Sequence, residues 1–433
     1  MTFFELSGTN LLLLIIGATL LVGFASDFLA ARLRIPDVIW LMMLGILVGP
    51  ALGLVSSSQF LVFAPILGVA ALVLILFDAG LDMRFREIRT IVGPALVFSA
   101  ASYAVAAVIL FVGTALIFPS EGLAGALLFG LSLACTSGAI VIPIARRLQL
   151  NEDLGRLAQL DGAFEDTFAI VSVTSLVLLV TAPASGGSSL HLALDLALPI
   201  PVGIVIGVIG GVAWTEFLSA WQDEPYAALA TLGFVLVVYT VAEVLGGSGI
   251  IAALVLGIVL GNSRNFRKLL GRGGTFRLGT SLRKVQGELA FLLRSFFLLL
   301  LGILADPRGL SPLLWAALLG ATGLLFCVRW GIAARTAGPP RLRPSWAPVL
   351  AGLYGRGLTS AVLIVIAFNE IPNASDLVLP AAILVLLTNV LMTAVLLYLD
   401  RTERIPRSTS TPTPRAEDEV LVFGPDLDAE PPT

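Results

Sequence analysis

The chain has 433 residues, of which 57% are hydrophobic and 13% are charged. That charged share is about half the share of a typical soluble domain, and apolar runs long enough to cross roughly 30 Å of hydrocarbon recur along most of the sequence. This composition excludes soluble enzymes, nucleic-acid-binding proteins and disordered proteins. The net charge of −3 carries little information, because the placement of Lys and Arg matters more than their sum. The expected fold class is an all-α polytopic membrane protein.

Apolar runs interrupted by Pro, Gly and charged residues predict about thirteen transmembrane helices. In chain order these spans cover about 10–31, 36–54, 61–81, 91–118, 122–145, 159–182, 192–218, 226–244, 248–262, 286–304, 312–334, 347–368 and 379–399. The first run lacks a basic leader and a small-residue cleavage site, so we interpret it as a retained helix rather than a signal peptide.

Basic residues lie almost entirely on one side of this arrangement. Connections after odd-numbered spans, together with the chain after the last span, hold 22 of the 26 Lys and Arg residues. The positive-inside rule therefore places the N-terminus outside and the C-terminus in the cytoplasm, with the protein in the inner (plasma) membrane of the cell. We expect residues 1–400 to form one membrane domain. Residues 401–433, rich in Pro, Ser, Thr and acidic residues, are expected to form a disordered cytoplasmic tail.

Few residues are available for metal or redox chemistry. Cys135 and Cys327 fall inside apolar runs and are expected to be core residues rather than a disulfide. His191, the only histidine, follows a Ser/Gly-rich stretch that predicts a loop. We expect no cofactor. A Gly-Gly-Ser-Gly stretch around Ser248 suggests an intramembrane serine protease, but the absence of a nearby histidine base disfavours this alternative.

An internal repeat connects the two halves of the chain. Span three ends in an aliphatic run with Gly and Asp82, and span ten ends similarly at Asp306. Each is followed by a long apolar span and then by an interrupted one, at Cys135 to Gly138 in span five and at Gly352 to Ser360 in span twelve. Spans three to six run opposite to spans ten to thirteen, which predicts an inverted-topology repeat with two crossing broken helices and a midplane site. Broken backbone at membrane depth needs protein or water beside it, so we expect the two breaks to face each other.

Five charged residues fall deep within the predicted spans. Span six carries Asp161, Glu165 and Asp166, while Arg329 and Arg356 lie in spans eleven and twelve. Arginine keeps its proton in proteins, so the two guanidinium groups balance two carboxylates and leave one without a fixed partner. Asp166 is rotated by roughly 100° from Glu165 on the helix and is the acid left over. A lone buried carboxylate binds a proton or a small cation, and their competition is an ion-exchange mechanism. The alternative is a static network of all five charges.

These residues resemble the monovalent cation/proton antiporter superfamily, of the bacterial sodium/proton exchanger type, over nearly all of residues 10–400. The sequence DGAFEDTFAIV, from Asp161 to Val171, is similar to an acidic signature that ends in Asn-Asp in sodium/proton exchangers and in Asp-Asp in electrogenic relatives. Gly247 to Asn262 resembles the Ser-Gly-Ile-Ile-Ala…Gly…Gly-Asn helix of the superfamily, and Gly355-Arg356-Gly357 resembles the Arg-Gly element of its second broken helix.

The resemblance assigns roles to individual residues. It implies that Asp166 binds the ion and the proton, with the monovalent cation, Na⁺ or K⁺, as the transported substrate. It implies that Thr136 and Ser137 offer oxygens to this cation, because hard oxygen ligands suit alkali ions. It also implies that Asp161 pairs with Arg356 and steadies the site.

Two departures from the superfamily pattern leave ion identity and stoichiometry open. Glu165 stands where relatives have Asn or the first Asp, and Ser137 stands where exchangers have the Asp of Thr-Asp-Pro, which is closer to the potassium-efflux branch. Arg329 falls on the helix that holds a lysine in electrogenic members and an arginine in electroneutral ones. If Glu165 is tied to Arg329, the exchange is one-for-one and electroneutral. If Glu165 titrates, two protons exchange for one cation and transport is voltage-sensitive. We expect electroneutral exchange, with Na⁺ as the favoured cation and K⁺ as the second.

The resemblance further implies a homodimer that works by alternating access. Core helices at about 91–182 and 312–399 would move against scaffold and dimer helices at about 10–81 and 226–304. The main rival is a sodium-coupled organic-anion transporter of related broken-helix fold. That rival requires spare positive charge at the breaks, whereas buried acids outnumber buried arginines in this sequence.

Overall fold

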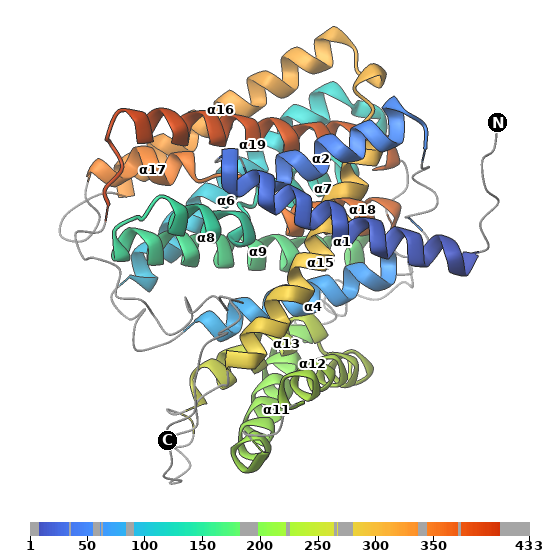
Figure 1. The fold of residues 1–433 in the computed structure, drawn as a ribbon, viewed down its shortest axis with the longest axis vertical. Coiled ribbons are helices and arrows are strands. Elements are labelled where there is room, and N and C mark those ends of the chain that lie inside the picture. Colours follow the sequence, from blue (N-terminus) through green and yellow to red (C-terminus); the bar gives the residue numbers. More distant parts are fainter. Residues whose placement is uncertain are drawn as a thin grey trace, which may run out of the picture.

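The computed structural model describes residues 8–33, 36–54, 61, 64–83, 91–181, 198–221, 226–263, 266, 280–336, 344–370 and 374–407. These residues are helical apart from short connections, and an isolated β-bridge joins Leu150 to Arg407 (Figure 1). His191 and the residues after Arg407 lie outside the described ranges, as do most of the basic connections.

The first half of the chain supplies eight α-helices to the described structure. They are α1 (Gly8–Leu33), α2 (Asp37–Ile46) continued by η1 (Leu47–Ala51), α4 (Ala64–Asp82), α6 (Val92–Ile117), α7 (Gly122–Ala134), α8 (Gly138–Arg147), α9 (Glu152–Thr181) and α11 (Pro199–Trp221). The second half supplies α12 (Ala227–Val244), α13 (Gly249–Gly261), α15 (Thr280–Leu304), α16 (Pro312–Thr336), α17 (Ala347–Gly352), α18 (Leu358–Glu370) and α19 (Val378–Arg401). The short 3-10 turns are η2 (Pro119–Glu121), η3 (Pro307–Gly309), η4 (Pro344–Trp346) and η5 (Ala374–Leu377).

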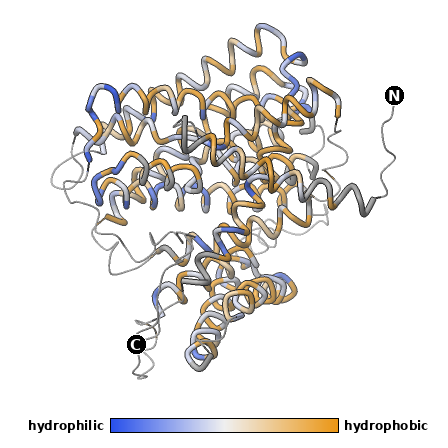
Figure 2. The backbone as a smooth tube through the Cα atoms, viewed as in Figure 1, coloured by the Kyte–Doolittle hydropathy of each residue, from blue (hydrophilic) through white to orange (hydrophobic). Residues whose placement is uncertain are grey.

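Each of the expected spans contains helix, and the two expected interruptions separate α7 from α8 and α17 from α18. By length and composition, 6 helices in the described part of the chain are long and apolar enough to cross a membrane. Figure 2 shows hydrophobic residues along most helices, with hydrophilic residues gathered mainly near helix ends. The all-helical membrane fold is therefore confirmed, while the count of thirteen crossings stays a prediction.

Two groups of helices can be separated by their packing. The core group consists of α6, α7, α8, α9, α16, α17, α18 and α19, and the scaffold group consists of α1, α2, α4, α11, α12, α13 and α15. The scaffold meets the core mainly through contacts of α4 and α15 with α18, of α2 and α15 with α19, and of α4 with α9. Contacts between α6 and α16 lie within the core group.

Glycines hold the scaffold helices α4 and α13 at very short range. A Cβ atom on Gly257 would lie 2.2 Å from the Phe77 carbonyl oxygen, and one on Gly80 would lie 2.3 Å from the Leu254 carbonyl oxygen. Only glycine permits such an approach of two helix backbones, and small residues commonly fill membrane helix interfaces for this reason. The glycines of the motif that ends at Asn262 therefore have a packing role.

Candidate functional site

The two helix breaks lie against each other in the middle of the core group. Between α7 and α8 the chain is extended at Cys135, with φ −74° and ψ 142°. The Ser137 amide donates to the Gly355 carbonyl of the second break at 2.9 Å. The Cys135 sulfur lies 3.3 Å from the Ser360 hydroxyl oxygen. The expected crossing of the two broken helices is thus confirmed.

Two glycines make this close approach possible. A Cβ atom on Gly357 would lie 2.6 Å from the Ser137 hydroxyl oxygen, and one on Gly162 would lie 2.5 Å from the Gly138 Cα atom. Real Cβ atoms do not approach other heavy atoms this closely, so larger residues would push the segments apart. Because glycine has no side chain at these two positions, the second break and helix α9 can pack directly against the first break.

Helix α9 presents its three acids to the breaks, and all three are buried. The Glu165 carboxylate accepts from Arg329 Nη1 at 2.7 Å and from the Thr136 amide at 2.6 Å. Asp161, one turn earlier on the same helix face, forms an ion pair with the same arginine. Arg329 therefore bridges Asp161 and Glu165, so Glu165 is tied to Arg329 in this structure.

Helix α6 supplies two further contacts to this ion-pair network. Ser99 donates its hydroxyl to Asp161 at 2.7 Å. The Arg329 guanidinium carbon lies 4.9 Å from the centre of the Phe98 ring, within the range of a cation–π interaction. Sequence reasoning missed both residues. The available signal was a small polar residue inside an apolar span, which in membrane helices usually faces a neighbouring helix.

The expected pairing of Asp161 with Arg356 is wrong. Asp161 pairs with Arg329, and the Arg356 Nε group donates instead to the Leu133 carbonyl in the last turn of α7. The physical reason is that Asp161 and Glu165 share one face of α9, so one guanidinium rising from α16 reaches both carboxylates. The expected members of the charge network are all buried near the crossing, but they pair with other partners than the sequence predicted.

Asp166 has different surroundings from the other two acids. One carboxylate oxygen, Oδ2, accepts from the Gly138 amide at 3.2 Å, at the first residue of α8. The other, Oδ1, is buried and has no hydrogen-bond partner among the described residues. The Ser137 hydroxyl is also buried and likewise has no hydrogen-bond partner among the described residues. Asp166 therefore keeps free acceptor capacity where the chain brings other oxygens close.

Each of these charged side chains lies at a half-helix end whose partial charge is opposite to its own. Arg329 donates to the Leu350 carbonyl at 3.2 Å, near the carboxyl end of α17, as Arg356 does to Leu133 at the carboxyl end of α7. Asp166 receives its backbone donor from the amino end of α8. Helix carbonyl ends carry partial negative charge and amide ends partial positive charge, so each side chain is stabilised by its helix end.

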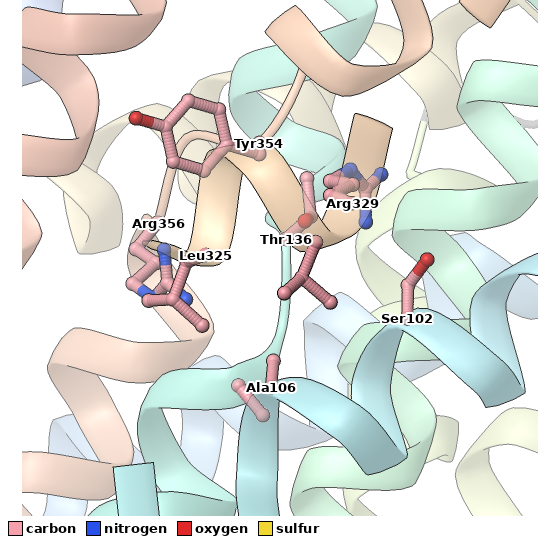
Figure 3. A pocket seen from close by; sticks show the side chains of 9 residues that line it. Ser102, Ala106, Thr136, Leu325, Arg329, Tyr354 and Arg356 are labelled. Carbon is pink, nitrogen blue, oxygen red and sulfur yellow. The ribbon is translucent and has the colours of Figure 1, made fainter. Parts of the chain in front are cut away.

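A small cavity of about 20 Å³ lies on the α6 and α16 side of the crossing (Figure 3). Arg329, Arg356, Tyr354, Thr136 and Ser102 supply its polar lining, and none of the three α9 acids borders it. Its volume is about that of one water molecule. The crossing thus has an arginine side, which borders the cavity, and an acidic side at α9.

An all-helical membrane protein with two broken helices crossing beside buried acids has the architecture of a secondary transporter. A family model described as "Sodium/hydrogen exchanger, transmembrane" matches residues 16–398. The chain therefore belongs to this sodium/hydrogen exchanger family.

Individual relatives agree with this assignment. The chain is 26% identical over 330 residues to the K(+)/H(+) antiporter NhaP of Alkalimonas amylolytica, covering 74% of this chain and 54% of the relative. It is 24% identical to Na(+)/H(+) antiporter 1 of Methanocaldococcus jannaschii, covering 57% and 59% of the two chains. The solved structure of the sodium proton antiporter MjNhaP1 from M. jannaschii superposes with a TM-score of 0.72 at 19% identity, covering 92% of this chain and 98% of that one. This chain spans about half the length of the first curated relatives that it matches.

Proposed function

We propose that this protein is a secondary active antiporter that exchanges a monovalent cation for H⁺ by alternating access. The observation that supports this best is the contrast among the α9 acids. Asp161 and Glu165 are both paired with Arg329, whereas Asp166 keeps one buried oxygen that has no partner among the described residues. A buried carboxylate of this kind is stabilised by a proton or by a small cation, and each displaces the other.

The contacts of Glu165 support the proposal of electroneutral one-for-one exchange. Its two carboxylate oxygens accept from Arg329 and from the Thr136 amide. In this proposal Glu165, held by Arg329 and by a backbone donor, keeps one protonation state through the cycle, and only Asp166 changes its occupant. One positive charge then moves in each direction, and the membrane potential has no effect on the balance.

Na⁺ is the first cation to test and K⁺ the second, since relatives of this chain are named as antiporters of either ion. Asp166, Thr136 and Ser137 are the residues we assign to the cation. The organic-anion alternative finds no support, because the matching family model is that of sodium/hydrogen exchangers and the similar proteins are named as cation/proton antiporters.

The protein is further proposed to be a homodimer in the inner membrane, with the N-terminus outside and the C-terminus in the cytoplasm. The sidedness of the basic residues supports this orientation. The helices of the scaffold group are the proposed dimer surface, and the core group is the proposed moving part.

Proton flux in proteoliposomes tests the proposal. The protein is reconstituted with a pH-sensitive dye inside, and Na⁺, Li⁺ or K⁺ is added at zero and at imposed membrane potential. We expect cation-driven proton flux that does not change with voltage. Voltage-dependent flux would make Glu165 a second titrating acid, and no flux with any of the three cations would overturn the proposed function.

A further inference from the structure

We infer that Thr359, in the first turn of α18, is a ligand of the transported cation and helps to determine which cation is accepted. This inference rests on the proposed antiport function. It adds an oxygen from the second broken helix to a site otherwise assigned to α9 and the first break.

The Thr359 hydroxyl differs from those of most threonines in the described helices, and only Thr19 of α1 is also buried there without a hydrogen-bond partner. Thr167, Thr322 and Thr393 each donate to the carbonyl four residues earlier at 2.7 Å. Thr359 is 1% exposed, and its hydroxyl has no hydrogen-bond partner among the described residues. A buried hydroxyl without a partner is costly, so its presence calls for a ligand or a function.

The crossing engages the two backbone carbonyls that lie three and four residues before Thr359. The carbonyl four residues before Thr359 belongs to Gly355 and accepts from the Ser137 amide at 2.9 Å. The carbonyl three residues before it belongs to Arg356 and accepts from the Asn389 side-chain amide at 2.7 Å. Both carbonyls that a helical threonine often bonds thus have a partner at the crossing, and the Thr359 hydroxyl donates to neither of them in the described structure.

The free hydroxyl lies beside the free carboxylate. The Thr359 side chain is within reach of the Asp166 carboxyl group, although no hydrogen bond of good geometry joins them in the described structure. Two residues before Thr359, a Cβ atom on Gly357 would lie 2.6 Å from the Ser137 hydroxyl oxygen. The adjacent Gly138 amide donates to Asp166 Oδ2 at 3.2 Å. Ser137, whose hydroxyl is also buried without a partner, precedes the residue that donates its amide to Asp166. Three segments of the chain thus bring one unbonded oxygen each to the same region: the first break, the second break and α9.

Such an oxygen set suits an alkali cation, which exchanges its hydration shell for several hard oxygen ligands. Threonine contributes a stiff side chain, because its branched Cβ restricts χ1. The position of its oxygen therefore depends on the backbone of the second break rather than on side-chain rearrangement. A rigid ligand of this kind responds to cation size, which is the property that selectivity requires.

The test compares Thr359→Val, which keeps the shape and removes the oxygen, with Thr359→Ser, which keeps the oxygen. Cation affinity is measured by titration calorimetry of the purified full chain at alkaline pH, where protons do not compete for Asp166, and exchange is measured in proteoliposomes. For Thr359→Val we expect affinity to fall by about tenfold or more, the size expected for a polar contact with a charged group. The loss should differ among Na⁺, K⁺ and Li⁺, and Thr359→Ser should stay within a few-fold of the original protein.

Two results would overturn the inference. Unchanged affinity in Thr359→Val would remove Thr359 from the cation site. An equal change for all three cations, accompanied by a shift of the pH profile of exchange, would show that Thr359 only orients the Asp166 carboxylate. A thermal unfolding profile matching that of the original protein controls for misfolding. If the original protein itself shows no cation-driven proton flux, the proposed function fails, which is a separate outcome.

Discussion

The two faces of α9 at the crossing differ in whether their carboxylates are held by fixed partners. On one face of α9, Asp161 and Glu165 share the Arg329 guanidinium, and Ser99 and the Thr136 amide use further carboxylate oxygens. On the other face, Asp166 has one backbone donor and one oxygen without a partner. Glu165 and Asp166 are neighbours in sequence, yet one is held in a network and the other is open. A rotation of roughly 100° between adjacent helical residues is sufficient to separate the two roles.

The largest effect on exchange is expected from replacing the Asp166 carboxylate. Asp166→Asn removes the group that binds either a proton or a cation, so cation-driven proton flux in proteoliposomes should be abolished while the protein still folds. Asp153→Asn, which changes an exposed acid in the first turn of the same helix, is the matched control and should leave the flux unchanged. Normal flux in Asp166→Asn would refute the mechanism.

The protein should lose stability when Arg329, the arginine that Asp161 and Glu165 share, is replaced. Arg329→Gln leaves Asp161 and Glu165 buried without a compensating charge, which costs about 3–5 kcal/mol of unfolding free energy. Arg356→Gln should cost less, about 1–3 kcal/mol, because the structure gives that arginine a carbonyl rather than a carboxylate acceptor. Melting temperatures in detergent rank the two variants. The opposite ranking would restore the pairing of Asp161 with Arg356.

A smaller loss of stability is expected when the Ser99 hydroxyl is removed. Ser99→Ala removes the donor to the Asp161 carboxylate and should cost about 1.5–3 kcal/mol, the range for hydrogen bonds to charged groups. Ser102→Ala is the control, because the Ser102 hydroxyl is buried on the same helix without a partner in the described structure. Equal melting temperatures for the two variants would mean that the Ser99 contact contributes nothing.

Gly162 tests how closely α9 must pack against the first break. A methyl group on Gly162 would overlap the Gly138 backbone, so Gly162→Ala should cost about 1–3 kcal/mol through overpacking and should slow exchange by displacing Asp166 from α8. Gly155→Ala, on the same helix with open space around its Cα, should be neutral or stabilising by up to about 1 kcal/mol. Undiminished stability and exchange in Gly162→Ala would show that the breaks tolerate a wider separation.

Much of the fold could be predicted because membrane helices follow simple rules. Apolar runs marked the helices, and Gly, Ser and Thr interruptions marked both breaks, since broken backbone inside a membrane requires such residues and protein contacts around them. The buried acids were recognised because charge inside apolar spans is rare. Ser99, Phe98 and Thr359 were not singled out, because hydroxyls and aromatic rings inside apolar spans are common and their partners lie far away in the chain.

The sequence by itself determined the membrane class, the two breaks and the surplus of one buried carboxylate, because each depends on composition or on order along the chain. Only the tertiary structure decided which arginine meets which acid and which hydroxyl is left free. Those outcomes depend on distances between α6, α9, α16 and the crossing breaks. Hydrogen bonds and ion pairs act over about 3–4 Å, and a helix rotation or shift of one residue reassigns them without changing any pattern visible in the sequence.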